Sequence, residues 1–441
     1  MKAKIITIII ILISISIHSQ DKKWTLKECV LYALENNITI KQSELDLENA
    51  EVDKRDAIGN FIPSLNGSST LSASTGLSQN PTTGILENAT QTTISAGLNS
   101  GVTLFDGLRN FKQLTRAKLS KLAAQYQLDN IKDDISLAVA NGYLQILFNR
   151  ENLAVAQAQY AVTEQDLKRT RELVNSGVVP RGDLLEIEAT AANQEQQIVN
   201  AENALRLSRI ALAQLLLIND YENFDIVDEN FIIPTTTVLE NSPKEIFAKA
   251  LTFRNDIKLS ETNVDLAKKD LEIARGASYP TLSAFFNYNT RYTDAISGVD
   301  IIEQFYTFDG ISYGLQLNVP IFNGFRTSNS IKRNKIAYQR SQFQLEQTKL
   351  DLENIINQAW NDTRGSLKAY EAAEKTLTAR KEAFNYARER FNVGLMNSFD
   401  FSQAQSRVEN AEADVIRTKY DYIFKLKVLE FYFGIPIDQL N

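Results

Sequence analysis

The chain is poor in residues that break regular structure and in residues that perform most catalysis. It has 8 prolines and 18 glycines among 441 residues, with one cysteine and one histidine. A single cysteine, Cys29, excludes an intrachain disulfide and a zinc site built on paired cysteines. A single histidine, His18, excludes multi-histidine metal sites. No P-loop pattern for nucleotide is present either. We therefore expect no catalytic residues, no metal and no cofactor, and the chain is not predicted to be an enzyme.

Basic charge and long apolar runs are also scarce. The net charge is −7 with a pI near 5.2, which argues against nucleic acid as a partner because phosphate binding needs a basic surface. One apolar run, Ile5–Ile17, follows Lys2 and Lys4. This order is typical of a secretory signal peptide, here residues 1–19, and the run is short for a membrane anchor of roughly 20 residues. His18 would leave with this segment.

What the sequence does contain is a long internal repeat. A shift of 217 residues places residues 24–224 on 241–441 without a gap. One register over two hundred residues is not a chance match, so we predict a first repeat at 20–224, a connector at 225–240 and a second repeat at 241–441. Identical residues met by the shift are Pro63/Pro280, Phe105/Phe322, Gly107/Gly324, Arg109/Arg326, Gly177/Gly394 and Asp183/Asp400.

Each copy shows the same order of patterns. A short helix near Trp24, in whose apolar face Cys29 is expected to be a buried structural thiol, precedes a second helix at about 38–59. Two strands follow, and then a long helical hairpin that reverses at a glycine. No proline interrupts residues 108–176 or 325–393, so each stretch can form one continuous helix. At 1.5 Å per residue, such a helix is roughly 100 Å long. The predicted strands are about 62–77, 90–105, 279–293 and 308–322, and the hairpins are 107–217 and 324–434.

The strands and the returning helices have different periodicities. Residues 94–104 and 311–321 alternate between apolar and small or polar side chains, and their runs of about 10–13 residues match tilted membrane strands. Outside the N-terminal segment no apolar run reaches the length of a membrane helix, so membrane entry would require strands that close into a barrel. Four strands cannot close, which favours three chains and a lumen over two chains. The returning helices carry a heptad seam with many alanines, which predicts close helix approach.

The combination resembles the TolC-type outer-membrane efflux protein family over essentially the whole mature chain. The junctions Val102–Arg109 and Val319–Arg326 are similar to the family's barrel-to-helix junction, and Phe391–Asp400 is similar to its periplasmic tip. The implied fold is α+β, mainly α: an outer-membrane β-barrel with four strands per chain and twelve in a homotrimer, continued by a long α-helical coiled-coil barrel. The implied function is the exit duct of a tripartite efflux or type I secretion system, working with a periplasmic adaptor and an inner-membrane pump in contact with outer-membrane lipid.

The resemblance also implies site residues at the tip. A periplasmic gate falls at Asp183, Asp400 and Gln403, the last at a position where relatives often carry a second aspartate. The adaptor-docking tip falls at Gly177, Val178, Gly394 and Leu395. Two simpler interpretations stay open: the aspartates cap their helices, and the glycines only allow the chain to turn. A coiled-coil rod of the periplasm without channel activity is the alternative function, and the transported substrate is not indicated.

Overall fold

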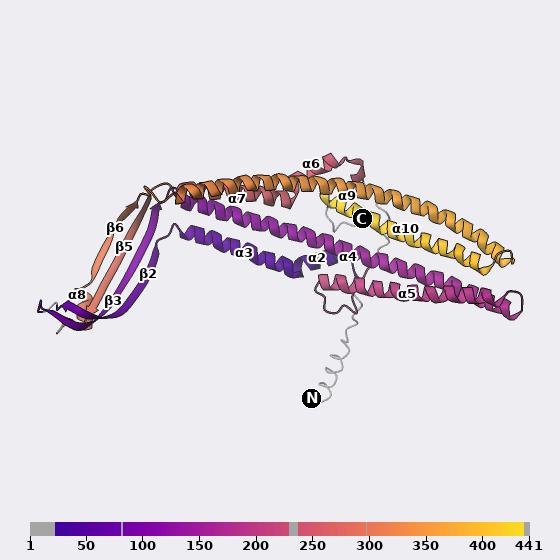
Figure 1. Ribbon diagram of the computed structural model, residues 1–441, viewed down its shortest axis with the longest axis horizontal. Helices are drawn as coiled ribbons and strands as arrows, with labels where there is room; N and C mark the ends of the chain where they lie inside the picture. The colour runs from indigo at the N-terminus through magenta and orange to yellow at the C-terminus, as the bar shows by residue number, and fades with distance from the viewer. Residues whose placement is uncertain (1–22, 81–82, 229–236, 297, 436–441) are drawn as a thin grey trace, which may run out of the picture. The chain divides into compact units, whose positions relative to one another are not determined.

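The computed structural model describes residues 23–435 apart from 81–82, 229–236 and 297, so the expected signal peptide lies outside the described residues. The chain is mostly helical with one larger antiparallel sheet, which confirms the predicted class at this level (Figure 1). It divides into two compact units, which are described separately. Unit 1 comprises Met1–Gln42, Asp129–Arg254 and Lys349–Asn441, and unit 2 comprises Ser43–Leu128 and Asn255–Thr348.

Unit 1 consists of helices with a small parallel pair of strands. The long helices α4 and α9 have 67 residues each, and, with α3, they have residues in both units. The elements of unit 1, including these shared helices, are β1 Lys23–Trp24, α2 Leu26–Asn36, α3 Ile38–Gly59, α4 Arg109–Asn175, α5 Arg181–Leu215, β4 Asp225–Ile226, η1 Val238–Glu240, α6 Pro243–Phe253, α9 Arg326–Asn392 and α10 Ser398–Phe433.

The main core of unit 1 lies where α2 packs on α4 and α5. Cys29 is fully buried there, as the helical pattern predicts, and Tyr143 is also buried and donates its hydroxyl to the carbonyl of Val227 at 3.0 Å. A Cβ added at Gly142 would lie 3.2 Å from the side chain of Leu212. The glycine inside α4 therefore allows α5 to approach closely, which explains why a poor helix former is present there.

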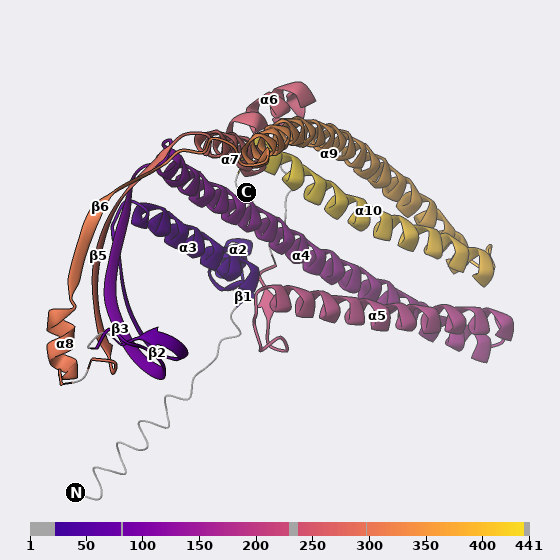
Figure 2. The same cartoon turned by 60° about the vertical axis from the view of Figure 1, so that its left-hand side comes forward.

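Unit 2 contains an antiparallel sheet in the order β2-β3-β5-β6. Both views show the four strands side by side (Figures 1 and 2). The register joins Ser64 to Gly101, Gly97 to Asn289 and Thr281 to Asn318. The elements of this unit outside the shared helices are β2 Ser64–Gln79, β3 Leu86–Phe105, α7 Asn255–Gly276, β5 Thr281–Thr293, α8 Ile301–Thr307 and β6 Gly310–Asn318.

The strands of unit 2 differ from their predicted bounds. Strand β3 begins four residues before the predicted start, and β6 ends at Asn318 rather than residue 322. Pro320 explains the second difference, because proline has no N–H to donate to a ladder. The segment between the predicted strands 279–293 and 308–322 contains helix α8. Gln304 of this helix holds it to the end of β5, because its Nε2 donates to the carbonyls of Thr293 and Val299 at 3.1 Å.

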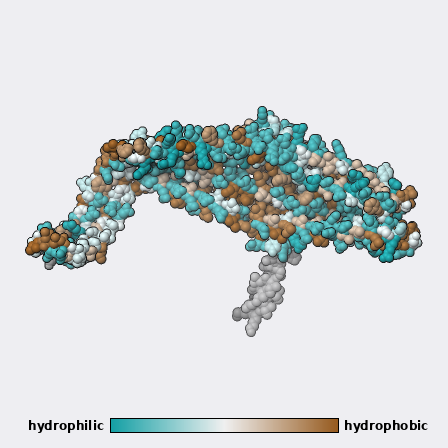
Figure 3. Space-filling model, viewed as in Figure 1, coloured by the Kyte–Doolittle hydropathy of each residue, from teal (hydrophilic) through white to brown (hydrophobic). Residues whose placement is uncertain are grey.

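Large apolar side chains on the edge strands of this sheet are exposed rather than packed in a core. Tyr313 and Leu315 on β6 are 79% and 66% exposed, and Leu65 on β2 is 71% exposed. Figure 3 shows hydrophobic residues gathered where β6 runs toward α9. Among the described residues, none of the helices is both long and apolar enough to cross a membrane.

Candidate functional site: the two helical turns

The two long hairpins of unit 1 reverse through turns of the same construction. Gly177 and Gly394 have φ of 76° and 79°, a conformation that glycine adopts without steric cost. The amide of Val178 donates to the carbonyl of Leu173 at 2.9 Å, and that of Leu395 to Arg390 at 2.8 Å. These are the bonds by which a left-handed residue ends a helix. The predicted reversal at both glycines is confirmed.

The first turn of α10 is capped by Asn397 rather than by an aspartate. Asn397 Oδ1 accepts from the amide of Asp400 at 2.8 Å, and its Nδ2 donates to Asp400 Oδ2 at 3.0 Å. At the start of α5 the capping position is Pro180, with no side-chain bond. Asp183 and Asp400 both lie in the first helical turn, where a negative charge is favourable. Neither aspartate occupies the N-cap position itself, but both lie where they can stabilise the start of their helix, so this simpler interpretation stays open beside the gate.

A cavity of about 420 Å³ lies between the two turns. It brings together four of the seven predicted site residues: Asp183, Val178, Gly394 and Leu395. Gly177 has open space around it, and Asp400 is exposed. Neither of them, nor Gln403, lines the cavity.

The turn of the second hairpin is anchored by phenylalanines. Phe401 is 1% exposed and stacks on Phe391 with ring centroids 4.4 Å apart. Phe384 contacts the same ring at 5.5 Å. Two residues farther along α10, Gln403 accepts a hydrogen bond from Arg407 at 3.1 Å. Phe401 falls on the predicted heptad seam of the second returning helix, but the predicted site included neither it nor its two aromatic neighbours.

Above the turns, polar side chains join the hairpin α4/α5 to the hairpin α9/α10. Five such contacts lie along the helices in unit 1, and we call them the polar seam. They are Arg169 Nη1 to Asn392 Oδ1 at 2.6 Å, Gln405 Nε2 to Thr163 Oγ1 at 2.6 Å, Gln159 Nε2 to Glu412 Oε2 at 2.9 Å, Gln194 Nε2 to Glu409 Oε1 at 2.5 Å, and Lys419 Nζ to Glu151 Oε2 at 3.1 Å.

Two carboxyl groups near this seam have raised pKa values. Burial raises the pKa of Glu409, with a smaller contribution from the neighbouring carboxylate of Glu412, although hydrogen bonds from Gln194 and Gln405 act in the opposite direction. Burial also raises the pKa of Asp166, against the positive charges of Arg169 and Arg388. Both shifts arise from removal of the charged form from water.

Comparison with known proteins decides the family. A sequence model described as outer membrane efflux protein matches residues 31–216 and again 247–434. The chain belongs to this family. Membership places it in the outer membrane and assigns it to export, as the resemblance implied.

Individual relatives agree with this assignment. The chain is 23% identical over 349 residues to the outer membrane protein TolC of Vibrio cholerae, covering 78% of each chain. It is 20% identical over 399 residues to the outer membrane efflux protein BepC of Brucella suis, covering 90% of this chain and 83% of that one. The solved CmeC outer membrane channel of Campylobacter jejuni shares the fold with a TM-score of 0.81 and 19% identity, over 93% of this chain and 85% of that one.

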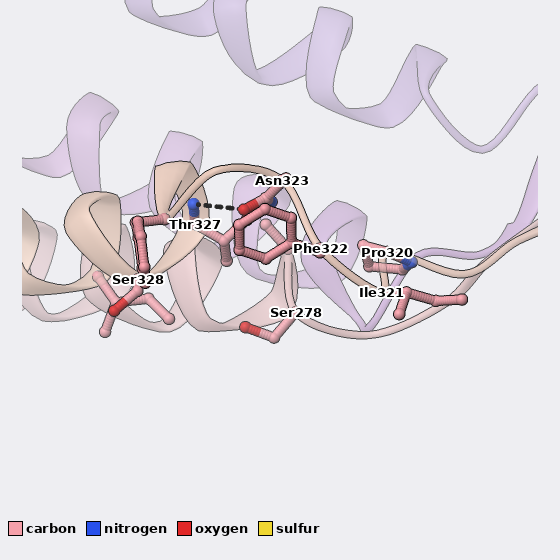
Figure 4. A pocket seen from close by; sticks show the side chains of 10 residues that line it. Ser278, Pro320, Ile321, Phe322, Asn323, Thr327 and Ser328 are labelled. Carbon is pink, nitrogen blue, oxygen red and sulfur yellow. Dashed lines mark hydrogen bonds between the residues drawn. The ribbon is translucent and has the colours of Figure 1, made fainter.

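A second concave surface, in unit 2, was not predicted. It lies where β6 runs into α9 and has a volume of about 350 Å³ (Figure 4). Ile321 and Phe322 line it and are 93% and 78% exposed. Asn323 fixes the start of α9, because its Nδ2 donates to Thr327 Oγ1 at 2.5 Å. The sequence signal for this surface was the repeated junction motif, which identifies the turn but not the exposure of its aromatic residues.

Proposed function

We propose that the chain forms a homotrimeric outer-membrane exit duct in which twelve strands close one barrel. One observation carries this proposal. The four-stranded sheet of unit 2 has two edges, β2 and β6, and an open edge leaves unpaired N–H and C=O groups that lipid cannot satisfy. Strands β2 and β6 run in opposite directions along the sheet. Edge β6 of one chain can therefore pair antiparallel with β2 of the next, which closes a ring without changing the strand pattern.

The exposed apolar side chains of the edge strand support lipid contact. Tyr313, Leu315 and Leu317 are 64–79% exposed on β6, and large exposed apolar surfaces mark interaction sites. In a barrel of twelve strands one face of each strand meets lipid and the other lines the lumen. A coiled-coil rod would have no use for such a surface, so the duct explains the sheet better than the alternative.

The helical turns are the proposed contact with the export partners. An adaptor would dock at Gly177, Val178, Gly394 and Leu395, and an inner-membrane pump would supply the energy for either efflux or type I secretion. Asp183, Asp400 and Gln403 would form the gate. Support comes from the exposure of Val178 and Leu395, which are 67% and 69% exposed, and from the exposed Asp400, which three-fold symmetry would repeat as a ring of negative charge that attracts cations.

Edge-to-edge pairing is tested by disulfide cross-linking. We would replace Ser64 on β2 and Asn318 on β6 by cysteine, since both lie at the helix-proximal ends of opposite sheet edges. Oxidation should yield covalent trimers on a denaturing gel. The matched control replaces Asn99 and Asn287, which are direct partners on β3 and β5, and should cross-link only within one chain. Monomers alone from the edge pair, with an efficient control, would refute the closed trimer.

A further inference from the structure

Helices α5 and α10 approach each other closely in unit 1, and one polar pair lies in their contact. Gln194 on α5 is 2% exposed, and its Nε2 donates to Glu409 Oε1 on α10 at 2.5 Å. The other end of the same amide, Gln194 Oε1, is buried, and no donor among the described residues hydrogen-bonds to it. A buried acceptor without a donor is destabilising, so the hydrogen bonding of this pair is incomplete.

Protonation of Glu409 would supply the missing donor. An ionised carboxylate only accepts hydrogen bonds, whereas a protonated carboxyl also has an O–H to donate. The second oxygen of a protonated Glu409 can donate to Gln194 Oε1 while Gln194 Nε2 continues to donate to Glu409 Oε1. Such a cyclic acid–amide pair satisfies both groups of the amide and removes the buried negative charge.

We propose that Glu409 and Gln194 form a proton-operated latch between α5 and α10. With the proton bound, two hydrogen bonds join the helices; when the proton leaves to water, one bond remains beside a buried charge and the helices are held less firmly. Since α5 and α10 belong to different hairpins that meet at the turns, the latch regulates opening of the helical end. This regulatory role, but not the pairing itself, rests on the proposed duct function.

The surroundings of Glu409 favour uptake of a proton. The neighbouring cavity of about 300 Å³ is lined by α4, α9 and α10, and its ionisable groups besides Glu409 are Glu412 and Lys381. These two form an ion pair at 2.9 Å, and Gln159 from α4 donates to the same Glu412 carboxylate. Gln194 is the contact from α5. Lys381 is therefore paired with Glu412, and the side-chain donors that reach Glu409 are amides rather than a cation.

The direction of the pH effect follows from linkage. Because burial raises the pKa of Glu409 above its ordinary value of 4.5, the paired state holds a proton at pH values where separated helices would release it. Pairing is therefore strongest below pH 4.5 and weakens as pH rises through the raised pKa. Acidification tightens the helical end, and alkalinisation loosens it.

The first test compares melting temperatures of the purified full-length protein at about pH 5 and about pH 8. Glu409→Gln keeps the shape and can form an amide–amide pair without a proton. The wild type should lose about 2–4 °C relative to this variant between the two pH values. Glu412→Gln removes a carboxylate of the same helix and should not reproduce that change. Gln194→Leu removes the acceptor and should reduce the acid stabilisation of the wild type. An equal pH response in wild type and Glu409→Gln would overturn the latch.

The second test measures the open fraction of single channels in planar bilayers while the pH on the helical side is varied. Wild type should open severalfold more often at the higher pH, and Glu409→Gln should show no such response. If pH affects melting as expected but no variant conducts at any pH, the duct fails while the pairing stands. If channels conduct and neither melting nor opening responds to the substitution, the latch fails while the duct stands.

Discussion

Apart from α8, residues 26–215 and 243–433 contain the same series of helices, and one shift of 217 residues relates their bounds. Helix α2 corresponds to α6, α3 to α7 and α4 to α9 with identical lengths, and α10 is one residue longer than α5. Even the capping is shared, because Thr25 and Ser242 each form a capping box with the glutamate three residues later. We infer two structural repeats whose helices are built to one plan.

The strands of the two halves are much less alike. Strands β2 and β3 have 16 and 20 residues, whereas β5 and β6 have 13 and 9. Helix α8 lies between the shorter pair. After the shift of 217 residues, β6 starts seven residues later than β3 and also ends four residues earlier. Helix lengths therefore agree between the halves while strand lengths differ at both ends. A change of loop length costs little free energy at one end, and Pro320 ends β6 early at the other.

The strand-to-helix junctions combine likeness and difference. In both halves a glycine and the next residue adopt positive φ, at Gly107–Leu108 and Gly324–Phe325. The surroundings differ, because Gly107 packs against the backbone of Gly276 while Gly324 has open space around it. The same backbone conformation is thus closely packed in the first half and open to its surroundings in the second.

Replacing the two junction glycines by alanine should give the largest difference in stability between the two halves. In Gly107→Ala the new Cβ would lie 2.4 Å from the carbonyl oxygen of Gly276 at φ +72°, so both strain and a backbone clash arise. We expect a loss of about 3 kcal/mol or more in the free energy of unfolding. Gly324→Ala adds only the strain of a positive φ, so we expect it to lower the free energy of unfolding by about 1 kcal/mol. Denaturant unfolding in detergent measures both, and equal losses would show that the contact with Gly276 is unimportant.

Replacing the glycines inside the two long helices by alanine should change the stability of the protein in opposite directions. Gly142→Ala places a Cβ 3.2 Å from Leu212, whereas the Cβ of Gly365→Ala meets nothing within 4 Å. We expect Gly142→Ala to destabilise the protein by about 1–2 kcal/mol and Gly365→Ala to stabilise it by about 0.5–1 kcal/mol. Melting temperatures of the two variants should move in opposite directions. A shift of the same sign in both would contradict the packing difference between α4 and α9.

Sequence patterns predicted the helices better than the site. Apolar periodicity and the scarcity of proline were enough to place α3 at 38–59 and the reversals at Gly177 and Gly394. The polar seam was missed because periodicity shows which face of a helix is packed but not which partner it meets. Gln194 falls on the heptad seam of the first returning helix, but only the structure shows Glu409 beside it. Helix α8 was missed because its seven residues are too few to establish a period.

The caps of the two returning helices provide a smaller contrast. Asn397 accepts from the amide of Asp400, whereas Pro180 makes no side-chain cap. Asn397→Ala should destabilise the start of α10 by about 1 kcal/mol, and Pro180→Ala should stay within about 0.5 kcal/mol. Hydrogen exchange of the first-turn amides measures the local effect. Faster exchange at α5 than at α10 in the respective variants would reverse the assignment of the cap.

The smallest expected effect distinguishes the two first-turn aspartates. Asp400 is exposed, while Asp183 is partly covered at the wall of the turn cavity. If Asp400 forms the charged ring, Asp400→Ala should weaken block by divalent cations, whereas Asp183→Ala should change it less. Salt screens charges beyond about 10 Å at 0.1 M, so the conductance itself should change by less than about twofold near that ionic strength and more in dilute salt. Single-channel recording at two salt concentrations checks this. A salt-independent change would indicate that the substitution altered the shape of the turn rather than its charge, and an unchanged block would remove Asp400 from the gate.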